Sequence, residues 1–348
     1  MNNQAIKDAL KNWPKIVARY QKADNKKAVT QIINTYLPFI GIWILMYFSL
    51  SWSYWITLGL AVINSFFLGR IFIIQHDCGH QSFMKNRKHN QIIGVMCSLF
   101  STIPFDYWAR LHSFHHSHNG QLEVVHIGDI RTYTVEQYKA LPRSKRIYYR
   151  LLRNPIILFL IGPIIYFTII HFPATELPWG NKKRWKKVKV KQLLNNFYQI
   201  SFYLVLGFLI GWKNFLLVHI PIFLFYGTFS LWFFYVQHQH EETYKKWKKD
   251  WDYLLSAIKG STFYKLPKVF QWLTGNIGFH HIHHLSPKIP NYNLEKCARE
   301  NPILTKYVTT VTFWGSLKYM FHHLWDEETE KMISFWKYYK MQRSSDHG

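Results

Sequence analysis

The chain has 348 residues, of which 49% are hydrophobic and 18% aromatic, and its formal net charge is +24. A basic chain can bind nucleic acid, but these basic residues form blocks between long apolar runs, which favours a membrane protein with no nucleic-acid partner. The three cysteines, Cys78, Cys97 and Cys297, form no CxxC pair, so they support neither a disulfide framework nor a thiolate metal site, and we expect buried or membrane-facing thiols.

The first 74 residues predict a polar segment followed by two membrane crossings. Residues 1–30 are polar and rich in lysine, and they lack the apolar core and cleavage site of a signal peptide, so we expect a cytoplasmic N-terminus. An apolar run then continues to about residue 74, broken only near residues 49–53. Because one crossing needs about 20 residues, this run predicts two transmembrane helices, at about 32–50 and 52–74.

A second apolar run predicts two further crossings, at about 197–211 and 214–236. Two shorter apolar segments are ambiguous: 91–105 ends at a proline, and 155–172 carries Gly162-Pro163 near its middle. Basic blocks prefer the cytoplasmic side. If all of them lie there, both segments return to the face that they left, as interfacial or re-entrant helices. A true crossing at 155–172 would instead reverse the orientation of everything after it.

Three short histidine clusters are the most informative motifs. HxxxH places two imidazoles on one helical face, and HxxHH places three. In the predicted topology the clusters share one side of the membrane, together with a histidine at the end of the fourth crossing. The nine histidines are His76 and His80, then His112, His115 and His116, then His238, and finally His280, His283 and His284.

This number of imidazoles predicts two metal ions. A mononuclear site usually takes three or four protein ligands, and neutral imidazole suits zinc, copper, iron and nickel. Two irons with open positions for dioxygen fit better than a zinc site. The chain has neither the HExxH motif of zinc peptidases nor the GxSxG motif of hydrolases.

Three polar residues near the clusters are candidates to orient the ligands. Asp77 lies inside the first cluster, Asp129 follows the second, and Asn276 stands four residues before His280. Each could hydrogen-bond the second ring nitrogen of a metal-binding histidine. The alternative for the two carboxylates is a helix cap or a solvated group.

The pattern HxxxH, HxxHH, HxxHH around two pairs of predicted membrane helices resembles the membrane-bound fatty acid desaturases. The string from Gly275 to Tyr292, which contains the third cluster, is similar to the third histidine box of bacterial acyl-lipid desaturases of the ω6/Δ12-like type, a group that includes the Δ5 type of Bacillus. The likeness extends from about Ile32 to Trp325.

The resemblance implies a non-haem di-iron enzyme. It would use O₂ and two electrons to introduce a cis double bond into the acyl chain of a membrane phospholipid or glycolipid. The nine histidines would be the iron ligands, with His238 matching the extra histidine that the family has ahead of its third box. The position of the double bond would be set by the depth of an apolar tunnel.

The expected fold is an all-α integral membrane protein. It has four transmembrane helices in two hairpins, interfacial or re-entrant helices, and a cytoplasmic cap that holds the di-iron site. The membrane-bound desaturase domain would cover residues 31–325, followed by a polar C-terminal tail at 326–348. The resemblance suggests the cytoplasmic membrane of a bacterium, with the histidines on the cytoplasmic side.

The electrons would come from a separate protein. The chain has no His-Pro-Gly-Gly haem signature and no GxGxxG after a strand, so we expect a ferredoxin or a flavodoxin with its reductase. The basic blocks at 182–187 and 245–249 would anchor the protein to anionic lipid head groups, or dock an acidic carrier.

Two alternative functions remain at this stage. A hydroxylase, an alkane monooxygenase or a carotenoid oxygenase would use the same kind of histidine cage to insert oxygen. A membrane metal transporter could instead line a pathway with histidines.

Overall fold

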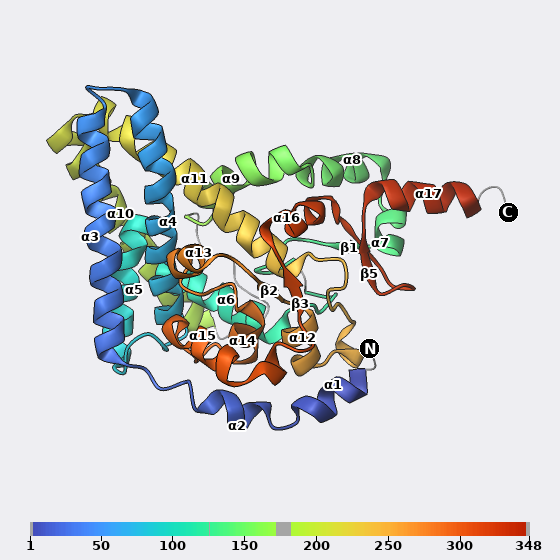
Figure 1. Cartoon of the computed structure of the whole chain (residues 1–348). Coiled ribbons are helices and arrows are strands. Elements are labelled where there is room, and N and C mark those ends of the chain that lie inside the picture. The colour runs from blue at the N-terminus through green and yellow to red at the C-terminus, as the bar shows by residue number, and fades with distance from the viewer. Residues whose placement is uncertain (1–2, 125, 172–181, 346–348) are drawn as a thin grey trace.

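The computed structural model describes residues 3–124, 126–171 and 182–345, and most of these residues are helical (Figure 1). In the described part, four helices are long and apolar enough to cross a membrane. They are α3 (Asn25–Ser49), α4 (Tyr54–Gly79), α10 (Lys182–Ile210) and α11 (Trp212–His238). The predicted fold class, a helical membrane protein with two hairpins of spanning helices, is confirmed.

The spanning helices extend beyond the apolar runs that predict them. α10 begins 15 residues before the predicted start at 197, because its lysine-rich first part is also helical. Lysine and arginine are good helix formers, so charge alone does not end a helix. Gly211 joins α10 to α11 with a φ of +82°, a backbone conformation that favours glycine.

The two ambiguous segments are sharply bent. Segment 91–105 belongs to α5 (Arg87–Ser101), which turns by 99° into α6 (Phe105–His118). Segment 155–172, whose last residue lies outside the described ranges, begins after α8 (Arg143–Leu152), and the chain bends there by 66°. It contains a π-helical turn, η1 (Ile157–Ile161), and α9 (Gly162–Ile169). A broken span and a re-entrant segment both show such bends, so neither segment is a straight crossing.

The remaining elements build a cap at one end of the spanning helices (Figure 1). It is held together by short helices and by two small sheets, in the orders β1-β4-β5 and β2-β3. The helices are α1 (Asn3–Leu10), α2 (Trp13–Ala18), α7 (Val135–Ala140), η2 (Lys248–Asp250), α12 (Tyr253–Lys259), α13 (Lys268–Leu273), α14 (His280–Leu285), α15 (Asn291–Glu300), η3 (Pro302–Leu304), α16 (Phe313–Ser316), η4 (Leu317–Phe321) and α17 (Phe335–Ser345). The strands are β1 (Tyr133–Thr134), β2 (Thr262–Tyr264), β3 (Thr309–Val311), β4 (Leu324–Asp326) and β5 (Lys331–Ile333).

Both ends of the chain are packed onto this cap. In the N-terminal segment, Ile6 and Leu10 of α1 are buried in the same apolar cluster as Ile282 of α14. The predicted polar tail at 326–348 is packed against the cap in its described part, because β5 pairs with β4 and Tyr338 of α17 is buried beside Tyr138. This C-terminal segment has few apolar residues, but they face the cap. The average polarity of the segment does not reveal this arrangement. The three cysteines are buried and unpaired, as predicted.

Tyr338→Ala should therefore destabilise the folded protein. Tyr338 is 2% exposed and its ring lies 5.2 Å from that of Tyr138. Removing a buried aromatic ring costs roughly 3–5 kcal/mol of unfolding free energy. Thermal unfolding in detergent should show a clear loss of stability, whereas Lys337→Ala, at an exposed neighbouring position, should change little. Equal stability of the two variants would mean that α17 is not part of the packed cap.

Candidate metal centre

The nine predicted histidines meet at the junction of the spanning helices and the cap. The end of α4 carries His76 and is capped by His80, and the end of α11 carries His238. α6 and α14 each contribute three more at the i, i+3, i+4 spacing that places side chains on one helical face. Four elements that are far apart in sequence thus direct imidazoles toward one place.

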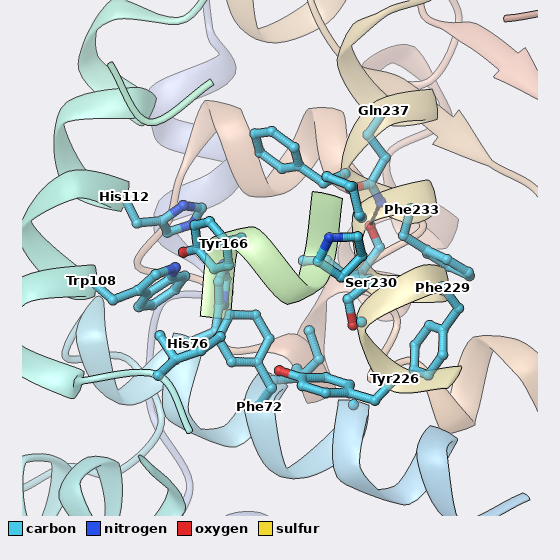
Figure 2. Close-up of a pocket in the computed structure, with 18 of the residues that line it drawn as sticks. Phe72, His76, Trp108, His112, Tyr166, Tyr226, Phe229, Ser230, Phe233 and Gln237 are labelled. Atoms are coloured by element: carbon cyan, nitrogen blue, oxygen red, sulfur yellow. Dashed lines mark hydrogen bonds between the residues drawn. The ribbon is translucent and has the colours of Figure 1, made fainter. Parts of the chain in front are cut away.

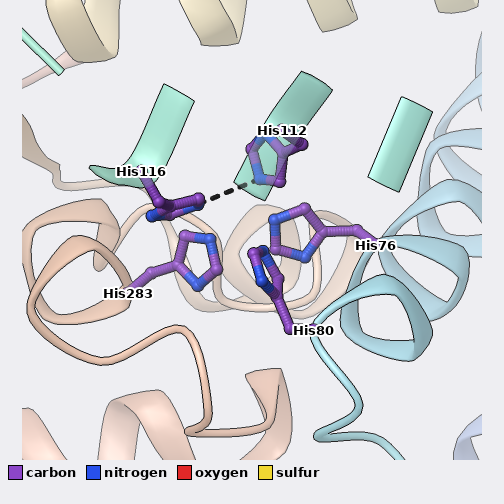
Figure 3. Close-up of side chains that lie close together, drawn as sticks. All are labelled: His76, His80, His112, His116 and His283. Carbon is purple, nitrogen blue, oxygen red and sulfur yellow. Dashed lines mark hydrogen bonds between the residues drawn. The ribbon is translucent and has the colours of Figure 1, made fainter. Parts of the chain in front are cut away.

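The structure divides the nine into two groups. In the first group, one ring nitrogen from each histidine lies within 4.8 Å of the others, and its five members face a common centre (Figure 3). The first group is His76, His80, His112, His116 and His283.

The second group contains the remaining four histidines. His115, His238 and His284 meet the same 4.8 Å limit. Nε2 of His280 lies 2.9 Å from Nε2 of His238 and 3.2 Å from Nε2 of His284, so we include it. This division into five and four could not be read from the sequence.

Two hydrogen-bond contacts determine which ring nitrogen of His238 and of His76 can bind a metal ion. Nδ1 of His238 lies 3.0 Å from the carbonyl oxygen of Gly260. Because a carbonyl oxygen only accepts, Nδ1 carries the hydrogen and Nε2 presents its lone pair to the second group. Nδ1 of His76 lies 3.0 Å from Oδ1 of Asp77, which leaves Nε2 of His76 free in the same way. Such contacts orient metal-binding histidines.

Burial disfavours the charged form of an imidazole, and metal ligands must be neutral. Burial, followed by the nearby His280 and His238, holds the pKa of His284 well below its usual range. Burial and the nearby His76 lower the pKa of His283 in the same way. Buried polar atoms are rarely left without a partner, yet both ring nitrogens of His283 and Nε2 of His80 have none within the protein. A donor set of neutral nitrogens with unused lone pairs fits two transition-metal ions.

Asp77 makes the predicted contact with His76, and the structure also shows which residue holds Asp77 in place. Oδ2 of Asp77 accepts hydrogen bonds from the backbone nitrogen of Asn291 at 2.6 Å and from its side chain at 2.8 Å. The carboxylate is 1% exposed, so these bonds and His76 use most of its accepting capacity. Sequence reasoning missed Asn291, although it lies in the Gly275–Tyr292 string and begins helix α15.

The other two predicted orienting residues make no such contact. Asn276 lies in the turn after α13, with a φ of +57°, and its side chain donates to the carbonyl of Asn291. The prediction assumed one continuous helix to His280, but α14 begins only at His280. Asp129 uses Oδ1 to accept from the backbone nitrogen of Ile130, and its buried Oδ2 has no partner in the protein.

An apolar cavity of about 380 Å³ lies directly beside both histidine groups (Figure 2). His76 and His112 of the first group and His280 of the second are among its lining residues. The rest of the lining is mainly aromatic and aliphatic, from α4, α6, α9 and α11. Labelled lining side chains in Figure 2 include Phe72, Trp108, Tyr166, Tyr226, Phe229 and Phe233.

The model of one protein family, fatty acid desaturase, matches residues 50–315. The chain belongs to the fatty acid desaturase family. The chain is 43% identical over 335 residues to a protein of Bacillus subtilis (strain 168) named fatty acid desaturase, with 96% of this chain and 93% of the relative covered.

More distant relatives carry more specific names. The desaturase is 27% identical to an sn-1 oleoyl-lipid 12-desaturase of Synechocystis sp., with 83% of this chain and 79% of the relative covered. It is 29% identical to an sn-1 acyl-lipid omega-3 desaturase (ferredoxin) of Nostoc sp., with 71% and 68% covered. These relatives imply an oxidoreductase acting on fatty acids, and the four apolar helices support a membrane protein.

Replacing the carboxylate beside His76 should weaken metal binding to the desaturase. Asp77→Asn removes the negative charge that holds His76 and Asn291, and loss of such a partner typically costs about 10–100-fold in metal affinity. Competition with a chelator during ferrous titration measures the change. Glu295→Gln on α15 is the control, because it removes the same charge from a carboxylate that pairs with Lys268 instead of a histidine. Equal affinity in the wild type and Asp77→Asn would contradict the assigned role.

Proposed function

We propose that the chain desaturates the acyl chain of a membrane lipid, forming a cis double bond with O₂ and two electrons at two irons held by the nine histidines. The observation that carries this proposal is the apolar cavity that ends on histidines of both groups. A substrate without polar groups near its reacting carbons has to be held by shape alone, and an apolar cavity does this.

The protein's own residues bind the chain and exclude water. Phe72 and Trp108 line the cavity beside His76 and His112, with the rings of Phe72 and Trp108 5.0 Å apart. Bound irons would supply the activation of O₂ that removal of two hydrogens from an unactivated chain requires. The histidine groups occupy the junction of helix ends and cap instead of lining a path through the spans, which favours a catalytic centre over a transport pathway.

The names of two relatives support a lipid-bound substrate. The Synechocystis relative is named for an oleoyl lipid, and the Nostoc relative for an acyl lipid and for ferredoxin. We therefore favour an acyl chain esterified in a phospholipid or glycolipid, and a separate ferredoxin, or a flavodoxin, with its reductase.

The distribution of basic residues supports a cytoplasmic location for the histidine groups, in the cytoplasmic membrane of a bacterium. Lys26 and Lys27 begin α3, and the backbone nitrogen of Lys85 bonds the side chain of Asn25, so these basic residues gather at the end of the first hairpin that carries His76. Basic residues near membrane helices prefer the cytoplasmic side.

Expression in a bacterium that makes only saturated lipids tests the reaction itself. With a reduced carrier supplied, mass spectrometry of derivatised fatty esters should find a new double bond and its position. His115→Ala, His238→Ala and His283→Ala should each abolish the product and lower the iron content. His281→Asn is the matched control, since His281 lies on α14 but in neither group. Hydroxylated esters in place of alkenes would contradict desaturation.

Only part of the predicted basic block at 245–249 is exposed and could dock a carrier or bind lipid head groups. Lys245 is 2% exposed, and Lys246 forms an ion pair with Glu330, so Lys248 and Lys249 are the exposed lysines of this block, with Lys249 4.0 Å from the carboxylate of the adjacent Asp250. In the block at 182–187, the side chains of residues 182–184 lie outside the described residues. We propose that Lys248 and Lys249 help to dock the acidic carrier.

Charge reversal tests this docking surface. Lys248→Glu with Lys249→Glu should lower turnover with reduced ferredoxin at low salt, because a basic patch raises the rate of encounter with an acidic partner. Iron content should not change. Reversal of Lys337 and Lys340 on α17 is the control of equal charge change. If the two double variants had equal turnover rates, the carrier would dock elsewhere on the protein.

A further inference from the structure

Helix α9 forms one wall of the apolar cavity although it is thinly packed. Pro163, Tyr166 and Phe167 of α9 line the cavity, but Pro163 is the only buried residue of the helix. Its other side chains are largely exposed and apolar. The most exposed are Ile164, Ile165 and Ile169. A helix with so few buried contacts opens at low free-energy cost.

The contact between α9 and α11 places α9 at the depth of the bilayer interior. A Cβ atom at Gly227 would lie 2.7 Å from Cβ of Pro163 and 3.0 Å from the Phe167 ring, so the two helices touch where α11 has no side chain. α11 begins at Trp212, and at ~1.5 Å per residue Gly227 lies roughly 22 Å along it, within the about 30 Å of bilayer hydrocarbon. Tilt of α11 makes this depth smaller. The exposed isoleucines of α9 therefore face lipid acyl chains. These chains belong to the bilayer leaflet on the side of the cap, which we call the adjoining leaflet.

The two ends of α9 differ in structure. The π-helical turn η1 precedes it and Gly162-Pro163 begin it, and π-helical turns are rare and frequently lie at functional sites. At the other end, Gln192 of α10 donates to the carbonyl of Ile170 at 2.8 Å. α9 is thus tied to α10 at its end and has an irregular joint at its start.

We propose that α9 is a lateral gate, which moves away from Gly227 about η1 and admits an acyl chain sideways from the adjoining leaflet. This inference rests on the proposed function, because it takes the cavity to be the acyl-chain site. Entry from the leaflet selects chains that are still attached to an intact bilayer lipid, whose head group stays at the membrane surface. An acyl chain delivered through water on a soluble carrier would have to enter through the cap.

Locking α9 to α11 tests the gate without relying on catalysis. In Phe167→Cys with Phe223→Cys, two rings of α9 and α11 that lie 5.9 Å apart are replaced by thiols, and a short bifunctional thiol reagent with a cleavable link can span the space that the rings fill. The probe is phosphatidylglycerol with a photoreactive group in its acyl chain, in vesicles with the full-length, iron-loaded protein. Peptide mass spectrometry then follows labelling near Phe72 and Tyr226.

The locked protein should lose labelling of the cavity, and cleavage of the link should restore it. The two single-cysteine variants, treated with the same reagent, should be labelled throughout, and they control for reaction at the buried native cysteines. Equal labelling of locked and released protein overturns the gate, as does an absence of labelling in every state. Labelling of the locked protein by a photoreactive acyl thioester in solution overturns leaflet entry. If the released protein is labelled but forms no alkene, the proposed function fails and the gate stands.

Discussion

The convergence of nine imidazoles at one place is the constraint on which the rest of the structure depends. Seven of them are buried, and His80 and His112 are partly buried. Burial disfavours the protonated ring, so the histidines cannot repel one another as cations and can crowd together. Several of their nitrogens then have no partner within the protein, and His283 has none on either side of its ring. Burying nitrogens that have no partner destabilises the fold. Metal cations bound between the four elements would supply the missing partners.

The membrane explains the position of this centre relative to the substrate. The groups lie just beyond the apolar spans, where α4 and α11 end at the cap. The cavity runs from Gly69 and Gly227, within the spans, to the histidines. In the proposed function, an acyl chain in this cavity would therefore meet the bound metal ions at the boundary between bilayer and cap.

Local patterns allowed much of the site to be predicted from the sequence. Helical spacing within each cluster identifies eight of the nine histidines, the end of the fourth predicted crossing adds His238, and each of the four spans is a long apolar run. Asp77 could be proposed because it stands next to His76 in sequence. The bond between the Asp77 carboxylate and Asn291 joins residues more than 200 positions apart, which no local pattern contains.

Two other sequence predictions differ from the structure for physical reasons. Asn276 was placed by helical spacing, but the helix does not extend back to it, because the chain adopts a left-handed turn there. The C-terminal residues looked like a tail because their average composition is polar, although Met332, Ile333 and Tyr338 are buried. Composition averages over faces, and packing depends on which face a residue occupies.

Anomalous X-ray scattering at the iron absorption edge, from crystals of protein loaded with ferrous iron, tests the central claim most directly. We predict two iron peaks, one within the group of His76, His80, His112, His116 and His283, and one within the group of His115, His238, His280 and His284. A single peak, peaks outside these groups, or the same positions filled only by zinc would contradict the account.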